Sequence, residues 1–302
     1  MDLFDLHCDT IFESIKTNQE MYSNDLAISL EKGSQLNKWC QTFAIFTPDT
    51  LKKKDAINHY NNALNFFNSQ CVKWSDNIKK CISLSDIEQA HRDNKCAAIL
   101  SVENGSILNG NIDNVYKIID DGVKIFGLTW NGNNELASGV EGSNNGITQF
   151  GFEVIKELQK ANVTIDVSHL NEKGFWQVVE HTQKPIVATH SNLKSICNHK
   201  RNLTNEQFVA ICKTGGVVGI NFYKKFLGDD CFDKILKNIY SMLSLGGENN
   251  ISIGSDYDGC TIEKSLDSID KFNDLCNYLI QHHIDENIID KICFKNAYNM
   301  FK

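Results

Sequence analysis

Residues 3–9 read LFDLHCD, an apolar run that ends in His7 and Asp9. Similar runs recur along the chain, each short, rich in β-branched or aromatic residues, and followed by polar residues or glycine. This pattern predicts eight strands. The seven later runs are QTFAIFTP (41–48), AAILSVENG (97–105), VKIFGLTWNG (123–132), VTIDVSHL (163–170), PIVATHS (185–191), GGVVGINFY (215–223) and ISIGSDYDG (251–259).

Segments with apolar residues at helical spacing separate these runs, most clearly at 56–74, 150–160, 205–213, 232–247 and 285–301. Because each connection can hold a helix, consecutive strands are expected to be parallel. Eight such units in 302 residues predict one (β/α)8 (TIM) barrel domain over residues 1–302. A doubly wound open sheet is the structural alternative, but the chain contains no G-x-G-x-x-G or G-x-x-x-x-G-K-[ST] phosphate loop.

Composition restricts the class of function. Hydrophobic residues make up 41% of the chain and charged residues 23%, as in ordinary globular proteins. The net charge of −8 and the absence of a basic stripe argue against nucleic-acid binding. No apolar run approaches the roughly 18 residues of a membrane span. The eleven cysteines include no C-x-x-C pair, and the first residues do not form a secretion signal, so we expect a cytoplasmic protein with reduced thiols.

Five of the predicted strands end in residues of metal-binding type. In a barrel these ends meet at the C-terminal mouth, where active sites lie. His7 and Asp9 are two positions apart, so they are expected to face the same way. Taken singly, each residue is better explained as a solvated histidine or a turn carboxylate, but their common position at one rim favours a metal site. The set is His7, Asp9, Glu103, His169, His190, Asp256 and Asp258.

Imidazole and carboxylate ligands together suit zinc, with cobalt, manganese or iron as substitutes. A catalytic zinc ion usually takes three protein ligands and keeps one position open. The set therefore has too many members for one ion, and it suffices for two ions if one carboxylate bridges them. Such a pair would generate a nucleophilic hydroxide at neutral pH without a serine or cysteine.

The motifs, in this order and spacing, resemble those of the membrane (renal) dipeptidase family of zinc peptidases, and its soluble bacterial-type members most of all. The motifs are the H-x-D of the first strand, SVENG, DVSHL, ATHSNLKSICNHKRN, GGVVGINFY and GSDYDG. The resemblance implies two zinc ions, one held by His7, Asp9 and Glu103. Glu103 would bridge to the second ion, held also by His169 and His190.

The resemblance also implies roles for two residues outside the metal shell. Asp256 would steer the bridging hydroxide and pass a proton to the leaving amine, a role that suits an aspartate beside the metals. Arg201 would bind the C-terminal carboxylate of the substrate through its two-pronged guanidinium. Without the resemblance, Arg201 is better interpreted as a surface residue of the basic HKR loop. We interpret Asp258 as a residue that supports the site or forms the turn.

The implied activity is zinc-dependent hydrolysis of small dipeptides, including those with a D-residue at the C-terminal position. No nucleic-acid or membrane partner is expected, and a homodimer is compatible with the resemblance. One alternative is a related binuclear metal hydrolase that cleaves another amide, a lactone or a phosphoester. Many of those barrels carry H-x-H and a carboxylated lysine, whereas this chain has H-x-D and Glu103. Another alternative is a metal-binding protein that has lost catalysis.

One stretch departs from the family pattern. In much of the family a histidine follows Leu-Thr at the end of the fourth strand, where it stabilises the peptide carbonyl oxygen. Here the sequence LTWNGNNELASG (128–139) places Trp130 at that position, and tryptophan offers one N–H donor and no acid–base chemistry. Asn131, Asn133 and His199 are candidates for the missing contact. The run ASGVEGSNNGI (137–147) is expected to form a mobile loop at the mouth or a plain surface loop.

Overall fold

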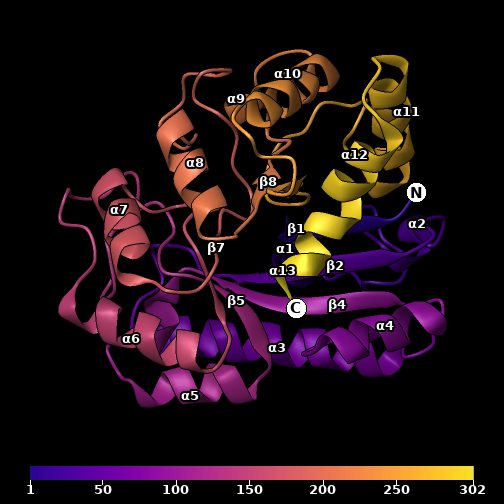
Figure 1. Ribbon diagram of the computed structural model, residues 1–302. Coiled ribbons are helices and arrows are strands. Elements are labelled where there is room, and N and C mark those ends of the chain that lie inside the picture. Colours follow the sequence, from indigo (N-terminus) through magenta and orange to yellow (C-terminus); the bar gives the residue numbers. More distant parts are fainter. Residues whose placement is uncertain (302) are drawn as a thin grey trace.

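The computed structural model describes residues 1–301 and shows eight parallel strands arranged as a barrel with helices around it (Figure 1). The sheet order is β7-β6-β5-β4-β2-β1-β9-β8, and a parallel bridge between Ala188 and Val218 joins its two edges. The predicted (β/α)8 barrel is thus confirmed. Its strands are β1 (Leu3–Cys8), β2 (Trp39–Phe46), β4 (Cys96–Glu103), β5 (Val123–Gly127), β6 (Thr164–Asp166), β7 (Ile186–Val187), β8 (Val218–Ile220) and β9 (Ile251–Ile253).

A ninth strand, β3 (Ile78–Lys80), was not predicted from the sequence. It pairs with the first residues of β4, ahead of the part of β4 that pairs with β5. With the sequence IKK it has neither the length nor the apolar alternation that identifies a strand.

The helices lie on the outside of the barrel (Figure 1). The first four predicted helical segments correspond to α3, α6, α8 and α10, and the fifth is divided into α12, a π-helical turn η3 and α13. Capping boxes at Ser83 and Thr204 begin α4 and α8. The bounds are α1 (Thr10–Thr17), α2 (Leu30–Gly33), α3 (Lys54–Lys73), α4 (Leu84–Arg92), η1 (Gly105–Leu108), α5 (Asp113–Asp120), α6 (Gln149–Lys160), α7 (Glu172–His181), α8 (Asn205–Lys213), α9 (Lys224–Leu227), α10 (Cys231–Ser244), η2 (Ile269–Lys271), α11 (Phe272–Gln281), α12 (Glu286–Asp290), η3 (Lys291–Lys295) and α13 (Asn296–Met300).

Two apolar clusters form the core. The larger one packs the helices against the outer face of the strands. The second joins strand residues, among them Phe4, Ile99 and Val187, to residues of α4, η3 and α13, such as Phe294. Among residues 1–301, no helix combines the length and the apolar character needed to cross a membrane.

A buried carboxylate ties β1 to both neighbouring strands. Asp5 accepts hydrogen bonds from Gln41 Nε2 (2.8 Å) on β2 and from the backbone N (2.8 Å) and Oγ (2.6 Å) of Ser255, just after β9. Ser255 Oγ in turn accepts the backbone N–H of Tyr257 at 3.1 Å. This network fixes the backbone on both sides of Asp256, which therefore has a defined place beside the end of β1.

Candidate metal centre and active site

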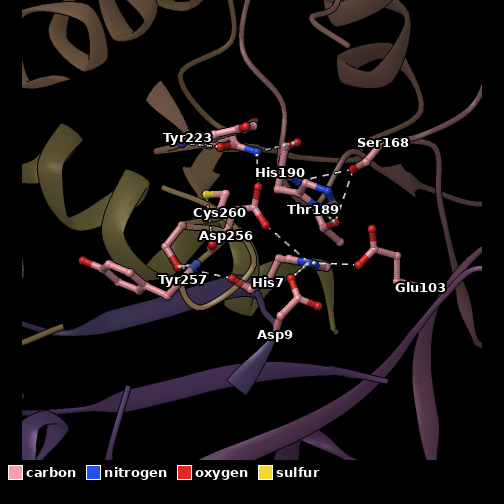
Figure 2. A network of polar contacts seen from close by, with 12 residues as sticks. His7, Asp9, Glu103, Ser168, Thr189, His190, Tyr223, Asp256, Tyr257 and Cys260 are labelled. Atoms are coloured by element: carbon pink, nitrogen blue, oxygen red, sulfur yellow. Dashed lines mark hydrogen bonds and ion pairs between the residues drawn. The ribbon is translucent and has the colours of Figure 1, made fainter. Parts of the chain in front are cut away.

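Polar side chains from several strands meet at the C-terminal mouth of the barrel. Figure 2 shows His7, at the end of β1, between three carboxylates. His7 Nε2 lies 3.4 Å from Asp9 Oδ2, 3.3 Å from Glu103 Oε2 and 3.9 Å from Asp256 Oδ1. All four side chains are buried. The first, third and eighth predicted strands thus deliver their polar ends to one place.

His169, which follows β6, extends the cluster on the far side of Glu103. Its Nε2 atom lies 2.8 Å from Glu103 Oε1. Its Nδ1 atom lies 3.0 Å from Oδ1 of Asn131, an oxygen that can only accept, so Nδ1 carries the proton. Nε2 of His169 is therefore the unprotonated nitrogen and is available as a metal ligand.

His190, which follows β7, is oriented by a short relay. Thr189 Oγ1 lies 2.6 Å from Asp166 Oδ2 and 2.8 Å from His190 Nδ1. Because the carboxylate only accepts, the hydroxyl donates to Asp166 and accepts from Nδ1–H of His190. Nε2 of His190 is then unprotonated, and it lies 2.9 Å from the unprotonated Nε2 of His169. Two lone pairs at this distance repel each other unless a cation binds them.

The pKa values of these two histidines favour the metal-binding form. Burial, together with the charge of Arg201, lowers the pKa of His169 to about 4. Burial and the neighbouring charges of His7 and Arg201 hold the pKa of His190 well below its ordinary value. Both rings are therefore neutral at physiological pH, as a metal ligand must be.

The carboxylates crowd one another. Burial and the charge of Glu103 raise the pKa of Asp9 to about 7. Burial also raises the pKa of Asp256. A bound cation would relieve the repulsion between these groups.

The residues present fit a metal centre. His7 Nε2 and Asp9 Oδ1 are buried without a hydrogen-bond partner among the described residues, an arrangement that costs free energy unless a cation binds them. Two groups have ligand atoms that all lie within 4.8 Å of one another, His7 with Glu103 and His190, and His7 with Asp9 and Asp256. The first group combines residues from both ligand sets that the resemblance implies, and the second includes Asp256, which the resemblance places outside the metal shell. The five predicted ligands lie together, but their division between two ions stays a prediction.

The segment after β9 holds Asp256 in a constrained backbone conformation. Asp256 has φ of 63°, and its Oδ2 accepts a hydrogen bond from Asn221 Nδ2 at 2.9 Å. A Cβ atom on Gly259 would lie 2.1 Å from Asp9 Oδ2 and 2.7 Å from Asp256 Oδ1. Glycine at 259 therefore lets this turn approach the two carboxylates closely.

Asp258 supports the turn from the other side. Its carboxylate accepts hydrogen bonds from Thr10 Oγ1 and from the backbone N of Ala27, both at 2.6 Å. It thereby fastens the start of α1 and the loop before α2 to the mouth, in agreement with the supporting role inferred from the sequence.

Arg201 is buried rather than on the surface. Its guanidinium donates to the backbone carbonyls of Ser168 and His190, and Nη2 lies 3.2 Å from His169 Nε2. Nε is buried without a partner among the described residues, and the group lies 5.3 Å above the ring of Phe226. Arg201 is thus a positive charge directly behind the cluster, and it is not part of the pocket lining.

A pocket of about 320 Å³ opens above the cluster. Aromatic rings line this pocket together with the polar cluster. These rings were not predicted from the sequence, because nothing in their spacing distinguishes them from core residues. These rings belong to Phe12, Phe46, Tyr223 and Phe226. Trp130 also lines the pocket, 6.5 Å from the ring of His169 between centroids.

Of the three candidates for the contact missing at Trp130, only Asn131 lines the pocket. Asn133 Oδ1 instead accepts the backbone N–H of Ser143 at 2.9 Å, in the outer part of the loop. His199 Nδ1 accepts the backbone N–H of Arg201 at 3.2 Å. Of these three residues, only Asn131 is therefore placed to contact the carbonyl oxygen of a bound peptide, the role of the family histidine that Trp130 replaces.

Hydrogen bonds fasten the glycine- and asparagine-rich run that was expected to be a mobile or plain loop. Gly139 N donates to Gly132 O at 2.8 Å, and Val140 N donates to His169 O at 3.0 Å. A Cβ atom on Gly139 would lie 2.2 Å from the carbonyl oxygen of Trp130. The close approach that glycine allows here fixes the backbone of Trp130 and Asn131 at the edge of the pocket.

Fold and site together define a barrel with a mixed histidine and carboxylate centre at its mouth. Comparison with known proteins agrees: residues 1–302 match the model of the membrane dipeptidase family, peptidase family M19. The chain belongs to this family and is accordingly a hydrolase of the metallo-dipeptidase class. An uncharacterised protein in the pqqA 5′ region of Klebsiella pneumoniae is 34% identical over 239 residues, 74% of this chain and 88% of that protein.

Two solved structures share the fold over the whole chain. One is the dipeptidase AC, a metallopeptidase of family M19, with a TM-score of 0.94 and 23% identity, covering 100% of this chain and 98% of that one. The other is a metallopeptidase from Rhodobacter sphaeroides, liganded with a phosphinate mimic of the dipeptide L-Ala-D-Ala. It has a TM-score of 0.93 and 22% identity, with the same coverage of 100% and 98%.

Proposed function

We propose that the protein hydrolyses the peptide bond of small dipeptides, with His7, Asp9, Glu103, His169 and His190 holding two zinc ions. The observation that carries the proposal is the cluster of buried ligand-type nitrogen and oxygen atoms at the floor of the pocket. Two of them, His7 Nε2 and Asp9 Oδ1, have no hydrogen-bond partner among the described residues. The pocket volume of about 320 Å³ is at the lower end for ligand sites and suits a small substrate. Bound metal ions would act as Lewis acids toward the carbonyl and lower the pKa of a coordinated water.

Asp256 is the proposed proton carrier. Asn221 holds one of its oxygens, and the other faces the cluster, 3.9 Å from His7 Nε2. Burial raises the pKa of Asp256, which brings proton uptake closer to neutral pH. It would take a proton from the attacking water and give it to the leaving amine.

Arg201 is the proposed partner of the substrate's C-terminal carboxylate. Burial lowers its pKa to about 10, so it stays a cation at neutral pH. Direct contact would require its guanidinium to exchange bonds to the carbonyls of Ser168 and His190 for bonds to the substrate. Asp9, whose carboxylate lines the pocket beside His7, would face the N-terminal ammonium. The two charges would thus orient the dipeptide across the metals.

The test is a substrate panel on the purified protein. L-Ala-L-Ala and L-Ala-D-Ala are the first substrates, since a phosphinate mimic of the latter binds the Rhodobacter sphaeroides protein. A lactone and a phosphoester complete the panel, and each is measured with and without 1,10-phenanthroline. We expect dipeptide cleavage that the chelator abolishes and that added zinc restores. Intact dipeptides in the presence of protein that holds about two zinc ions per chain would refute the proposal.

A further inference from the structure

Three aromatic rings form a continuous wall on one side of the pocket. Phe46, the last residue of β2, lies between Phe12 of α1 and Trp130 after β5. The Phe12 and Phe46 ring centroids are 5.3 Å apart with an interplanar angle of 76°, and those of Phe46 and Trp130 are 5.0 Å apart at 69°. All three line the pocket and are partly exposed. We call this set the Phe12–Phe46–Trp130 wall.

The wall is rigidly supported. His59 Nε2 contacts the carbonyl oxygen of Phe46 at 2.8 Å, and the close approach of Gly139 fixes the backbone at Trp130. Edge-to-face packing of the three rings adds to this support. A side chain that packs here would therefore displace water from a preformed apolar surface, which favours binding.

The charges around the wall select against charged side chains. The described residues that line the pocket include Glu13 and several acidic groups of the cluster, but no lysine or arginine. An acidic side chain would face these carboxylates. Lys16, whose Nζ lies 5.9 Å from the centroid of the Phe12 ring, already pairs with Glu13 at 2.8 Å, so neither an acidic nor a basic side chain finds a free partner there.

The Phe12 end of the wall lies next to the residue that is proposed to bind the substrate's N-terminal ammonium. Asp9, the proposed partner of the ammonium, directly precedes α1, which carries Phe12. Arg201, the proposed partner of the carboxylate, lies 5.3 Å from the centroid of the Phe226 ring, which is not part of the wall. The N-terminal side chain of a dipeptide oriented in this way would point toward the Phe12–Phe46–Trp130 wall.

From this arrangement we propose that the Phe12–Phe46–Trp130 wall binds the side chain of the substrate's N-terminal residue and selects large apolar side chains. The inference rests on the proposed dipeptidase function and adds a substrate class to it. Apolar pockets discriminate by about tenfold or more for each methylene that they bury. Leu-Ala and Phe-Ala should therefore have kcat/KM values at least about tenfold above Ala-Ala and Asp-Ala.

The test compares pairs of substrates on one enzyme preparation, so that losses of folded protein or bound metal cancel in the ratio. In Trp130→Ala the ratio of kcat/KM for Leu-Ala over Ala-Ala should fall about tenfold, whereas Trp130→Phe should retain most of it. Tyr223 lines the pocket outside the wall, and Tyr223→Ala should leave this ratio unchanged whatever its effect on the overall rate.

The outcomes separate the two proposals. If dipeptides are cleaved but Leu-Ala and Ala-Ala differ by less than about twofold, the wall has no role in selection and only this inference fails. The same holds if Trp130→Ala preserves the ratio. If the zinc-loaded protein cleaves no dipeptide, the proposed function fails and this inference fails with it.

Discussion

Replacing Thr189 by valine is expected to weaken metal binding without any change to a ligand. Valine has nearly the shape of threonine but lacks the hydroxyl that links Asp166 Oδ2 to His190 Nδ1 at 2.6 and 2.8 Å. Asp166 would keep its bonds from the backbone N of Thr189 and from the N and Oγ of Ser168. His190 Nδ1–H, by contrast, would lose its acceptor in a buried place.

The magnitude follows from that loss. A buried N–H without an acceptor costs about 1–3 kcal/mol, so the free energy of unfolding should fall by that amount. Without the hydroxyl, nothing keeps the proton on Nδ1, and the tautomer with a protonated Nε2 cannot bind metal. Loss of such orienting contacts typically weakens metal affinity about 10–100-fold. This corresponds to about 1.4–2.8 kcal/mol.

The assay is competition for zinc between the protein and a chromophoric chelator, with Thr189→Ser as the matched control. Serine restores the hydroxyl and should bind zinc about as tightly as the original protein, while Thr189→Val should bind it 10–100-fold more weakly. Equal zinc affinity in the valine and serine variants would refute the tautomer assignment of His190 and the relay on which it rests.

Three further outcomes are expected. Asp256→Asn should lower kcat by about 10²–10⁴ while zinc content stays unchanged, because the residue is proposed to carry a proton; loss of zinc measured by elemental analysis would instead make it a ligand. Gly139→Ala should lower the free energy of unfolding by about 1–3 kcal/mol, since its Cβ would lie 2.2 Å from Trp130 O; an unchanged melting temperature would contradict the close packing of this loop. Zinc affinity of the metal-free protein should fall as the pH drops from 8 to 6, by about tenfold per unit for each proton displaced. Burial and the charge of Glu103 raise the pKa of Asp9 to about 7. Burial alone would lower the pKa of His7, but the neighbouring Asp9 carboxylate raises it well above its ordinary value. Both side chains therefore hold protons at low pH, and a metal ion must displace these protons to bind. Calorimetric titrations with equal affinities at both pH values would contradict this.

The barrel was predictable because its strands are apolar runs that end abruptly in polar residues. The same ends marked His7, Asp9, Glu103, His169 and His190, since parallel strands bring their carboxyl ends to one mouth. Their mutual distances were not predictable, because these depend on the tilt and stagger of the strands.

What the sequence did not show is the support around those residues. Thr189 is an ordinary threonine in ATHS, and only the structure places its hydroxyl between a carboxylate and an imidazole. The sequence made Asn131 a candidate for a contact to the substrate. The structure also places its Oδ1 atom 3.0 Å from Nδ1 of His169. The loop at 137–147 was expected to be either a mobile mouth loop or a plain surface loop, because composition does not report hydrogen bonds across a turn. Phe12 and Phe46 resemble core residues until their neighbours are known.

The bond between Asp5 and Ser255 links residues 250 positions apart in the chain. At about 5–20 residues per second, a ribosome would need roughly 12–50 s to synthesise the intervening chain. During that interval β1, which carries His7 and directly precedes Asp9, has its β2 neighbour and the Gln41 donor to Asp5, but neither β9 nor the two donors of Ser255. The earliest part of the site to be synthesised is thus among the last to be completed, and we expect the nascent chain to acquire its metals only after β9 has emerged.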